Sequence, residues 1–282
     1  MAETHTVFAG SIPKFYDSLM VPMIFAAYAK HMAELVAAFS PGAVLETAAG
    51  TGVVTRALAP RLGAHARYVV TDLNQPMLTH AAARQGVDAR IEWQPADALH
   101  LPFADGTFDA VCCQFGVMFF PDRVAGYTEA RRVLRPGGHF VFSTWDRIEN
   151  NAFADEVTNA LATVFPDNPP RFPALVPHGY HDVAGIRDEL SRAGFTDIRI
   201  ETREEVSHAA SARDAATAYC QGTPLRNEIE ARDAGLLQFA TDRATEAIAS
   251  RHGDGPVAGK IQAHVVVATS AGAPARVSPA AP

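Results

Sequence analysis

VLETAAGTG, residues 44–52, decides the fold of this chain: an apolar run ends in an acid and enters a glycine-rich turn. The apolar run is typical of a buried strand, and residues 53–62 continue with the apolar spacing of a helix. A strand–turn–helix joint presents free backbone N–H groups, and glycine lets a ligand approach them closely. Glycine-rich turns are common, so the surrounding residues must indicate what this one holds.

Three interpretations of this segment are open: two ligand-binding patterns and a turn with a purely structural role. The dinucleotide pattern G-x-G-x-x-G is matched best from Gly50, with Gly52 next but Thr55 in place of the third glycine. The pattern acid-x-Gly-x-Gly-x-Gly is matched by Glu46, Gly50 and Gly52. Its first glycine is replaced by Ala48, the smallest possible change. This second pattern resembles motif I of the class I S-adenosylmethionine (SAM) dependent methyltransferases.

A second strand pattern, YVVTD at residues 68–72, ends in a carboxylate about 20 residues beyond the turn. That spacing is typical of an acid that binds a ribose, because a carboxylate accepts hydrogen bonds from both ribose hydroxyls. The resemblance assigns the ribose to Asp72, the adenine face to Leu73, and Met77 to the same cofactor site. Asp72 could instead cap the next helix, but Asn74 already stands at the capping position, which favours the ribose role.

Two later segments fit the same scheme. PADALHLPF, residues 95–103, is similar to a D-A-x-x-L-P-F segment that follows the third strand in small-molecule methyltransferases. The resemblance implies that Asp97 accepts from the adenine amino group and that the Ala98 N–H meets a ring nitrogen. Ligands of open α/β sheets bind beyond the carboxyl ends of the strands. We therefore expect Gln114 and Phe115, which end the strand pattern of residues 108–116, to line the cofactor site.

ARRVLRPGGHFVFSTW, residues 130–145, reads as a helix end, a Pro-Gly-Gly turn and a strand. The same R-x-L-x-P-G-G turn is typical of the ubiquinone and menaquinone biosynthesis methyltransferases, which this chain resembles. The resemblance implies an α/β fold: a Rossmann-like, doubly wound sheet of seven strands. Its expected strand order is 3-2-1-4-5-7-6, with the last strand antiparallel and with helical cap insertions. It also implies SAM as the cofactor.

The N-terminal part is expected to be helical, with Pro22 starting a second helix that ends at residues 40–42. IPKFYD, residues 12–17, is similar to a segment that folds over the bound cofactor in related small-molecule methyltransferases. By that resemblance Tyr16 donates a hydrogen bond to the methionine carboxylate of SAM.

The sequence predicts five regions along the chain. They are an N-terminal helical lid (1–42), a SAM-binding Rossmann-like core (43–148), a cap insertion (149–180), the remainder of the core (181–270) with a helical insertion at 211–258, and a disordered tail (271–282). Helices are expected at 153–165, 181–193 and, broken at 222–224, 212–250. Strands are expected at 196–206 and 261–269.

The composition of the chain restricts the classes of molecule that it can bind. The 282 residues carry 24 Lys and Arg against 31 Asp and Glu, a formal net charge of −7, which argues against a nucleic-acid substrate. No apolar run looks long enough for a membrane span, and no secretion signal is visible, so we expect a cytoplasmic protein. The three cysteines suggest no disulfide framework, and no metal-binding spacing is found. Either a monomer or a homodimer is compatible with the sequence.

We therefore expect a SAM-dependent methyltransferase that acts by in-line displacement on a small, apolar or aromatic metabolite. The alternatives are a nicotinamide-dependent oxidoreductase and a SAM-fold protein that binds without catalysis. Since the sulfonium is already a good electrophile, alignment can suffice and a base is optional. His100, His178, His181 and Tyr180 are candidate bases. None is singled out, and the acceptor atom is left open.

The first test concerns Asp72. Replacement Asp72→Ala should weaken SAM binding by about 1–3 kcal/mol, because the ribose hydroxyls lose their acceptor. Isothermal titration calorimetry with SAM measures the loss, and parallel titrations with S-adenosylhomocysteine, NAD and NADP separate the classes of function. Unchanged SAM affinity in the variant would remove Asp72 from the ribose.

Overall fold

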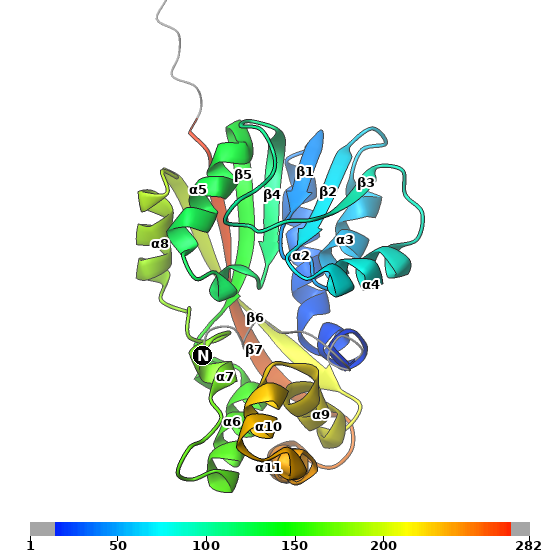
Figure 1. Cartoon of the computed structure of the whole chain (residues 1–282), viewed down its shortest axis with the longest axis vertical. Helices are drawn as coiled ribbons and strands as arrows, with labels where there is room; N and C mark the ends of the chain where they lie inside the picture. Colours follow the sequence, from blue (N-terminus) through cyan, green and yellow to red (C-terminus); the bar gives the residue numbers. More distant parts are fainter. Residues whose placement is uncertain (1–14, 272–282) are drawn as a thin grey trace, which may run out of the picture.

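The computed structural model describes residues 15–271, which contain a seven-stranded sheet (Figure 1). The strand order is β3-β2-β1-β4-β5-β7-β6. Strands β1 to β5 pair in parallel, and β7 is antiparallel to β5 and to β6. The predicted fold and strand order are therefore confirmed. The strands are Ala43–Glu46 (β1), Arg67–Asp72 (β2), Ile91–Pro95 (β3), Phe108–Gln114 (β4), Leu134–Trp145 (β5), Asp197–Ala209 (β6) and Val257–Thr269 (β7).

Both faces of β1, β2 and β4 are buried, because successive side chains point to opposite faces and helices cover each, whereas the edge strand β3 is only partly buried. Val44 belongs to one apolar core with α2 and α3, whereas its neighbour Leu45 belongs to the other with α5 and α8. The short helix η3 (Ala59–Arg61) extends α3. The covering helices are Ala26–Ala38 (α2), Val53–Leu58 (α3), Gln75–Gln85 (α4), Arg123–Val133 (α5) and Val183–Arg192 (α8).

The N-terminal helix differs from the sequence prediction. A π-helix, η2 (Tyr16–Phe25), runs directly into α2, and Pro22 lies inside η2 instead of starting a new helix. Proline lacks an N–H and its ring clashes with the preceding turn of an α-helix. The wider π-helical turn accommodates Pro22 without ending the helix. Residues 12–14 of the predicted cofactor-covering segment lie outside the described residues, as do residues 272–282 of the predicted tail.

This continuous helix also corrects the expectation about apolar runs. Tyr16–Ala38 spans 23 residues with a mean hydropathy of 1.3, which by length and composition alone is enough for a membrane span. The sequence interpretation missed it because it broke the segment at Pro22. Of the most apolar window, 56% is buried inside the protein. Core helices commonly show the same composition, and Tyr28, Ala33 and Val36 of α2 are buried in the two cores.

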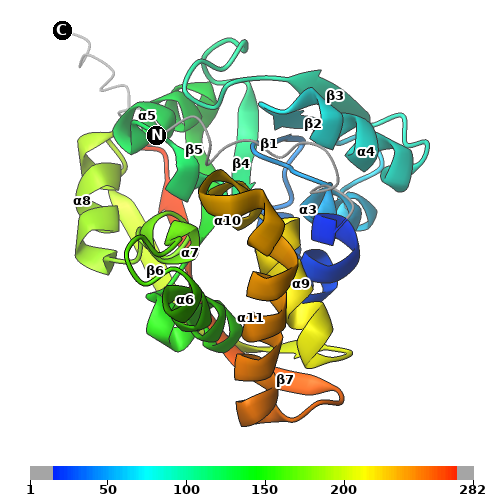
Figure 2. The same ribbon diagram turned by 60° about the horizontal axis from the view of Figure 1, so that its bottom comes forward.

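Beyond the parallel sheet, β6 and β7 continue side by side as a long two-stranded ribbon (Figure 1). Each has 13 residues and is longer than predicted. Five helices gather around the far part of this ribbon, and Figure 2 shows them from below. They are Ala152–Val164 (α6), Phe172–Leu175 (α7), Ala212–Gly222 (α9), Leu225–Asp233 (α10) and Leu237–His252 (α11). The two predicted insertions, 149–180 and 211–258, thus come together in space.

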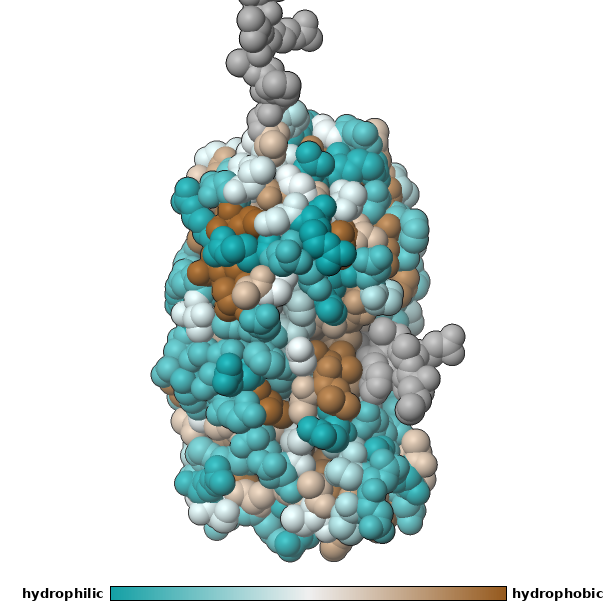
Figure 3. All heavy atoms as spheres, turned by 90° about the vertical axis from the view of Figure 1, so that its left-hand side faces the viewer, coloured by the Kyte–Doolittle hydropathy of each residue, from teal (hydrophilic) through white to brown (hydrophobic). Residues whose placement is uncertain are grey.

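The surface on the side drawn in Figure 3 is mainly hydrophilic, and apolar residues gather there in small separate areas. Among the described residues, the exposed large apolar side chains lie on different elements and are far apart in sequence. They are Leu73, Val87, Leu175, Val206 and Phe239. Only Leu73 belongs to the predicted cofactor site.

Candidate active site

The turn after β1 has a left-handed backbone at alternate residues. Ala48, Gly50 and Gly52 have φ angles of 52°, 56° and 79°. A side chain added at Gly50 would meet no atom within 4 Å, so open space lies next to this residue. A Cβ at Gly52 would come within 3.0 Å of Ala81 Cβ on α4. Gly50 therefore leaves room for a ligand, whereas Gly52 lets α3 and α4 pack closely.

Ala48 replaces the first glycine of the motif and keeps the left-handed conformation, which is unfavourable for a residue with a Cβ. Its methyl group points toward Gly116, where an added Cβ would lie only 2.5 Å from it. The same Cβ would lie 2.7 Å from Cys113 Sγ. Gly116 thus provides the space that the Ala48 side chain occupies.

Glu46 lies behind this turn and is 2% exposed. Its carboxylate accepts a hydrogen bond from Thr55 Oγ1 at 2.7 Å and another from the Tyr68 hydroxyl. Burial raises the pKa of Glu46 to about 7, and the two hydroxyl donors oppose that rise. The contacts shown are with α3 and β2, and the role of Glu46 toward the cofactor stays a prediction.

Asp72 ends β2 and holds the turn from the other side. Its carboxylate accepts the N–H of Gly50 at 2.8 Å and the N–H of Asn74 at 2.7 Å. Asn74 is the N-cap residue of α4, as predicted, but its side chain makes no capping hydrogen bond. Burial raises the pKa of Asp72, and the two backbone donors oppose the rise. Leu73 is 65% exposed and Met77 is buried.

Asp97 and Ala98 follow β3 in a tight turn. The Asp97 carboxylate accepts the N–H of Leu99 at 2.9 Å and approaches His100 Nδ1 at 3.4 Å. These bonds form a local turn of the kind that aspartate favours. The predicted adenine contacts of Asp97 and Ala98 stay predictions.

Gln114 ends β4 and carries an unsatisfied oxygen. Its amide nitrogen donates to the Phe25 carbonyl at 3.3 Å, whereas Oε1 is buried and has no hydrogen-bond partner in the described part of the chain. Phe115 follows with a φ of 52° and stacks on Trp145, with ring centroids 3.9 Å apart. A strained aromatic residue at a strand end is common at functional sites.

Tyr16 lies over the same strand ends from η2 and stacks on Phe25 at 5.1 Å. Burial raises the pKa of its hydroxyl, and the Asp72 carboxylate raises it further.

A cluster of basic side chains around the buried Asp17 carboxylate anchors η2, and the sequence interpretation missed it. The Asp17 carboxylate lies 2.9 Å from Arg84 Nη1 and 3.2 Å from His80 Nε2, both on α4. Arg56 of α3 lies 3.6 Å away. Because the three basic residues lie 39 to 67 positions beyond Asp17 in the sequence, no local pattern could have indicated the contact.

A largely apolar pocket opens beside Tyr16 and Phe115. Including its opening to solvent it encloses about 580 Å³. Aromatic rings from η2, the ends of β4 and β5, α7 and α9 line it, among them Phe25, Trp145 and Tyr219. Such a pocket binds an apolar ligand with a few polar groups to orient it.

Of the four candidate bases, two are buried in the structure. They are His178 and Tyr180. His178 lines the pocket. The Tyr180 hydroxyl is hydrogen-bonded to Tyr127 and Glu189 instead. His100 has an 84% exposed side chain, and His181 bonds to the His178 carbonyl at 2.8 Å.

The comparisons with known proteins agree with this geometry. A family described as "Methyltransferase domain" matches residues 45–142, from β1 to β5. A demethylmenaquinone methyltransferase of Mycolicibacterium vanbaalenii is 35% identical over 165 residues, which are 55% of this chain and 69% of that protein. This chain belongs to the class I SAM-dependent methyltransferases. It is a methyltransferase with SAM as its cofactor, and the oxidoreductase alternative is set aside.

Solved structures show the same fold at low identity. The phosphoethanolamine N-methyltransferase 2 of Haemonchus contortus, in complex with SAM, aligns with a TM-score of 0.58 at 14% identity. The alignment covers 93% of this chain and 56% of that chain. The cyclase SpnF aligns with a TM-score of 0.53 at 17% identity, over 86% of this chain and 82% of that chain.

The residues present fit SAM. The open space at Gly50 admits a ligand close to the backbone, and the exposed Leu73 side chain offers an apolar surface for a base. The buried Gln114 Oε1 has no hydrogen-bond donor in the described part of the chain, and the ammonium group of SAM would supply one. No group of three or more His, Cys, Asp or Glu within residues 15–271 could hold a metal ion.

The contact between Ala48 and Gly116 can be tested by overpacking it. Gly116→Ala should destabilise the protein by about 1–3 kcal/mol, because the new Cβ meets Ala48 and Cys113. Gly63→Ala is the matched control, since a Cβ there meets no atom within 4 Å. Urea denaturation of both variants gives the comparison, and equal stability of the two would contradict the close contact.

Proposed function

We propose that this methyltransferase acts on a small, apolar, aromatic acceptor held in the pocket beside Phe115. The observation that carries the proposal is that Tyr16 and Phe115, both predicted to line the cofactor site, also line this pocket. An acceptor in the pocket would therefore lie next to the methyl donor. The flat aromatic lining favours a planar ring.

When bound, SAM supplies an electrophilic methyl group on a sulfonium. The residues of this chain then contribute orientation and the exclusion of water. Phe115 and Trp145 form a rigid stacked floor, and η2, anchored by Asp17, covers it. Holding acceptor and methyl carbon in line can lower the barrier by about 7–11 kcal/mol at best. In-line displacement therefore needs no further group unless the acceptor must lose a proton.

The relatives support the size and character of the acceptor. The similar Mycolicibacterium vanbaalenii protein is named for demethylmenaquinone, a compound with a quinone ring. A quinone-like or quinol-like acceptor would match the aromatic lining. The net charge of −7 supports a partner other than nucleic acid.

The proposal includes the cofactor contacts expected from the sequence. The proposed residues are Tyr16, Glu46, Ala48, Gly50, Gly52, Asp72, Leu73, Met77, Asp97, Ala98, Gln114 and Phe115. We further propose that residues 15–42 act as the described part of a lid, that 149–180 and 211–258 form the acceptor cap, and that the protein is cytoplasmic, as a monomer or homodimer.

Labelling identifies the acceptor. Incubation with methyl-labelled SAM and a metabolite extract from the source cells, followed by mass spectrometry, should give a labelled aromatic or quinone-like product. A labelled polar or charged product would contradict the proposed acceptor class.

The same acceptor tests the pocket. Phe119→Ala should raise the KM for the acceptor about tenfold, because an aromatic contact worth roughly 1.5–3 kcal/mol when fully buried is removed. The Kd for SAM should not change. Phe165→Ala is the control, since Phe165 is also partly buried but does not line the pocket. Equal effects of the two substitutions on KM would place the acceptor elsewhere.

A further inference from the structure

One polar group in the aromatic pocket is placed to accept a proton. His178 is 5% exposed and lines the pocket together with Tyr16 and Phe115. Its ring lies beside Trp145, with centroids 5.9 Å apart. The aromatic surroundings give the imidazole little competing solvent.

The hydrogen bonds of His178 determine which nitrogen carries the proton. Nδ1 lies 2.8 Å from the carbonyl oxygen of Asp146. A carbonyl oxygen only accepts, so Nδ1 must carry the hydrogen. In the neutral ring Nε2 is then an unprotonated acceptor. Within residues 15–271 the hydrogen bonds of the His178 ring involve Nδ1 and not Nε2.

Burial lowers the pKa of His178 to about 4, with the Asp146 carbonyl and carboxylate opposing the fall. The ring is therefore neutral at physiological pH, with Nε2 unprotonated. The hydrogen bond to the Asp146 carbonyl indicates the tautomer.

We propose that His178 is the catalytic base of this enzyme and that the acceptor is a hydroxyl compound, a phenol or an enol. This inference rests on the proposed aromatic acceptor. The hydroxyl oxygen forms a bond to the methyl carbon while the carbon–sulfur bond breaks, and its electron pair stays on sulfur. The hydroxyl proton passes to His178 Nε2. The resulting imidazolium returns that proton to water when product leaves.

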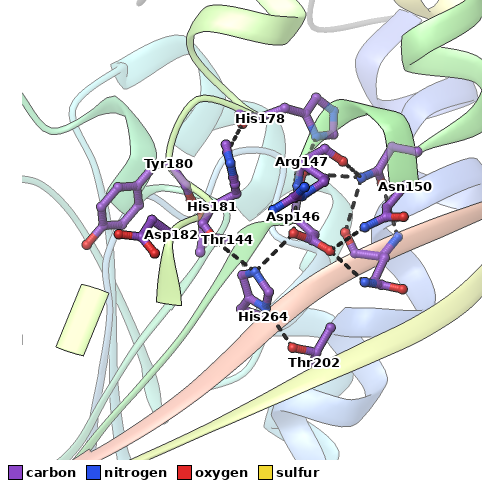
Figure 4. Close-up of polar contacts among 12 residues, drawn as sticks. Thr144, Asp146, Arg147, Asn150, His178, Tyr180, His181, Asp182, Thr202 and His264 are labelled. Carbon is purple, nitrogen blue, oxygen red and sulfur yellow. Dashed lines mark hydrogen bonds and ion pairs between the residues drawn. The ribbon is translucent and has the colours of Figure 1, made fainter. Parts of the chain in front are cut away.

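A buried polar network holds the base in place (Figure 4). The Asp146 carboxylate accepts the Arg147 N–H at 2.7 Å, and it also accepts side-chain amides from Asn150 at 2.7 Å and Gln262 at 2.5 Å. These contacts fix the segment whose carbonyl binds His178. Figure 4 shows the His178 ring at the edge of this network.

A second histidine, His264, holds the segment that follows His178. His264 Nε2 lies 3.0 Å from the His181 carbonyl and 3.2 Å from Asp146 Oδ1. His264 Nδ1 lies 3.0 Å from the Thr202 hydroxyl. His181 in turn bonds to the His178 carbonyl. Asp146 and His264 are thus positioning residues for His178 and do not line the pocket.

The test compares two acceptors of the same shape, 2-naphthol and 2-naphthalenethiol. The naphthol is un-ionised at neutral pH, like the tyrosine phenol with its pKa of about 10, so its methylation needs a base. The thiol is largely ionised and needs none. The variant is His178→Asn, whose side-chain NH2 can replace Nδ1–H toward Asp146 but whose side chain has no basic nitrogen.

We expect His178→Asn to lower kcat for 2-naphthol by about 10²-fold or more and to change kcat for the thiol less than about threefold. The Kd for SAM, measured by calorimetry, should stay unchanged. The residual rate with naphthol should rise with pH as the free naphtholate forms. That pH dependence is a response that a purely structural role would not produce.

Three results would overturn the proposal, and they differ from one another. Equal losses with both acceptors would make His178 structural. Methylation of the thiol but not the naphthol by the unaltered enzyme would exclude O-methylation while leaving the aromatic acceptor intact. Methylation of neither compound would overturn the aromatic acceptor and, with it, the role of His178.

Discussion

The left-handed turn after β1 is the constraint on which the rest of the site depends. The chain must leave the central strand and enter α3 within a few residues while its N–H groups stay available. Backbone bonds from Thr47 to Cys112 and from Ala49 to Thr71 fasten the turn to both neighbouring strands. The Asp72 carboxylate binds the Gly50 N–H. Strain of about 1–2 kcal/mol at Ala48 is tolerated because these contacts over-determine its conformation.

From this turn the molecule divides into two kinds of surface that meet at Tyr16 and Phe115. On the side proposed for the cofactor, backbone groups, carboxylates and the Gln114 amide predominate. On the side proposed for the acceptor, aromatic rings predominate and His178 is a buried polar exception. Binding a charged cofactor requires directed hydrogen bonds, whereas an apolar acceptor is bound by shape and exclusion of water. The strand ends bring the two surfaces together.

Much of the fold could be predicted from local patterns. Apolar strands, the glycine turn and the Pro-Gly-Gly turn are contiguous in sequence, and the family resemblance that they carry implied the correct sheet order. Pro22 was misinterpreted because proline usually ends a helix, whereas here a wider helical turn accommodates it. The cluster around Asp17 could not be predicted, since its partners lie on two later helices.

The sequence by itself determined the α/β architecture, the family and SAM as the cofactor, because backbone geometry and strand burial leave local signatures. Only the tertiary structure decided which way the Ala48 methyl group points and which histidine faces the pocket. The three candidate histidines looked alike in sequence, since an imidazole acquires its tautomer and its pKa from neighbours distant along the chain. His178 differs from the others through the Asp146 carbonyl and the aromatic rings packed around it.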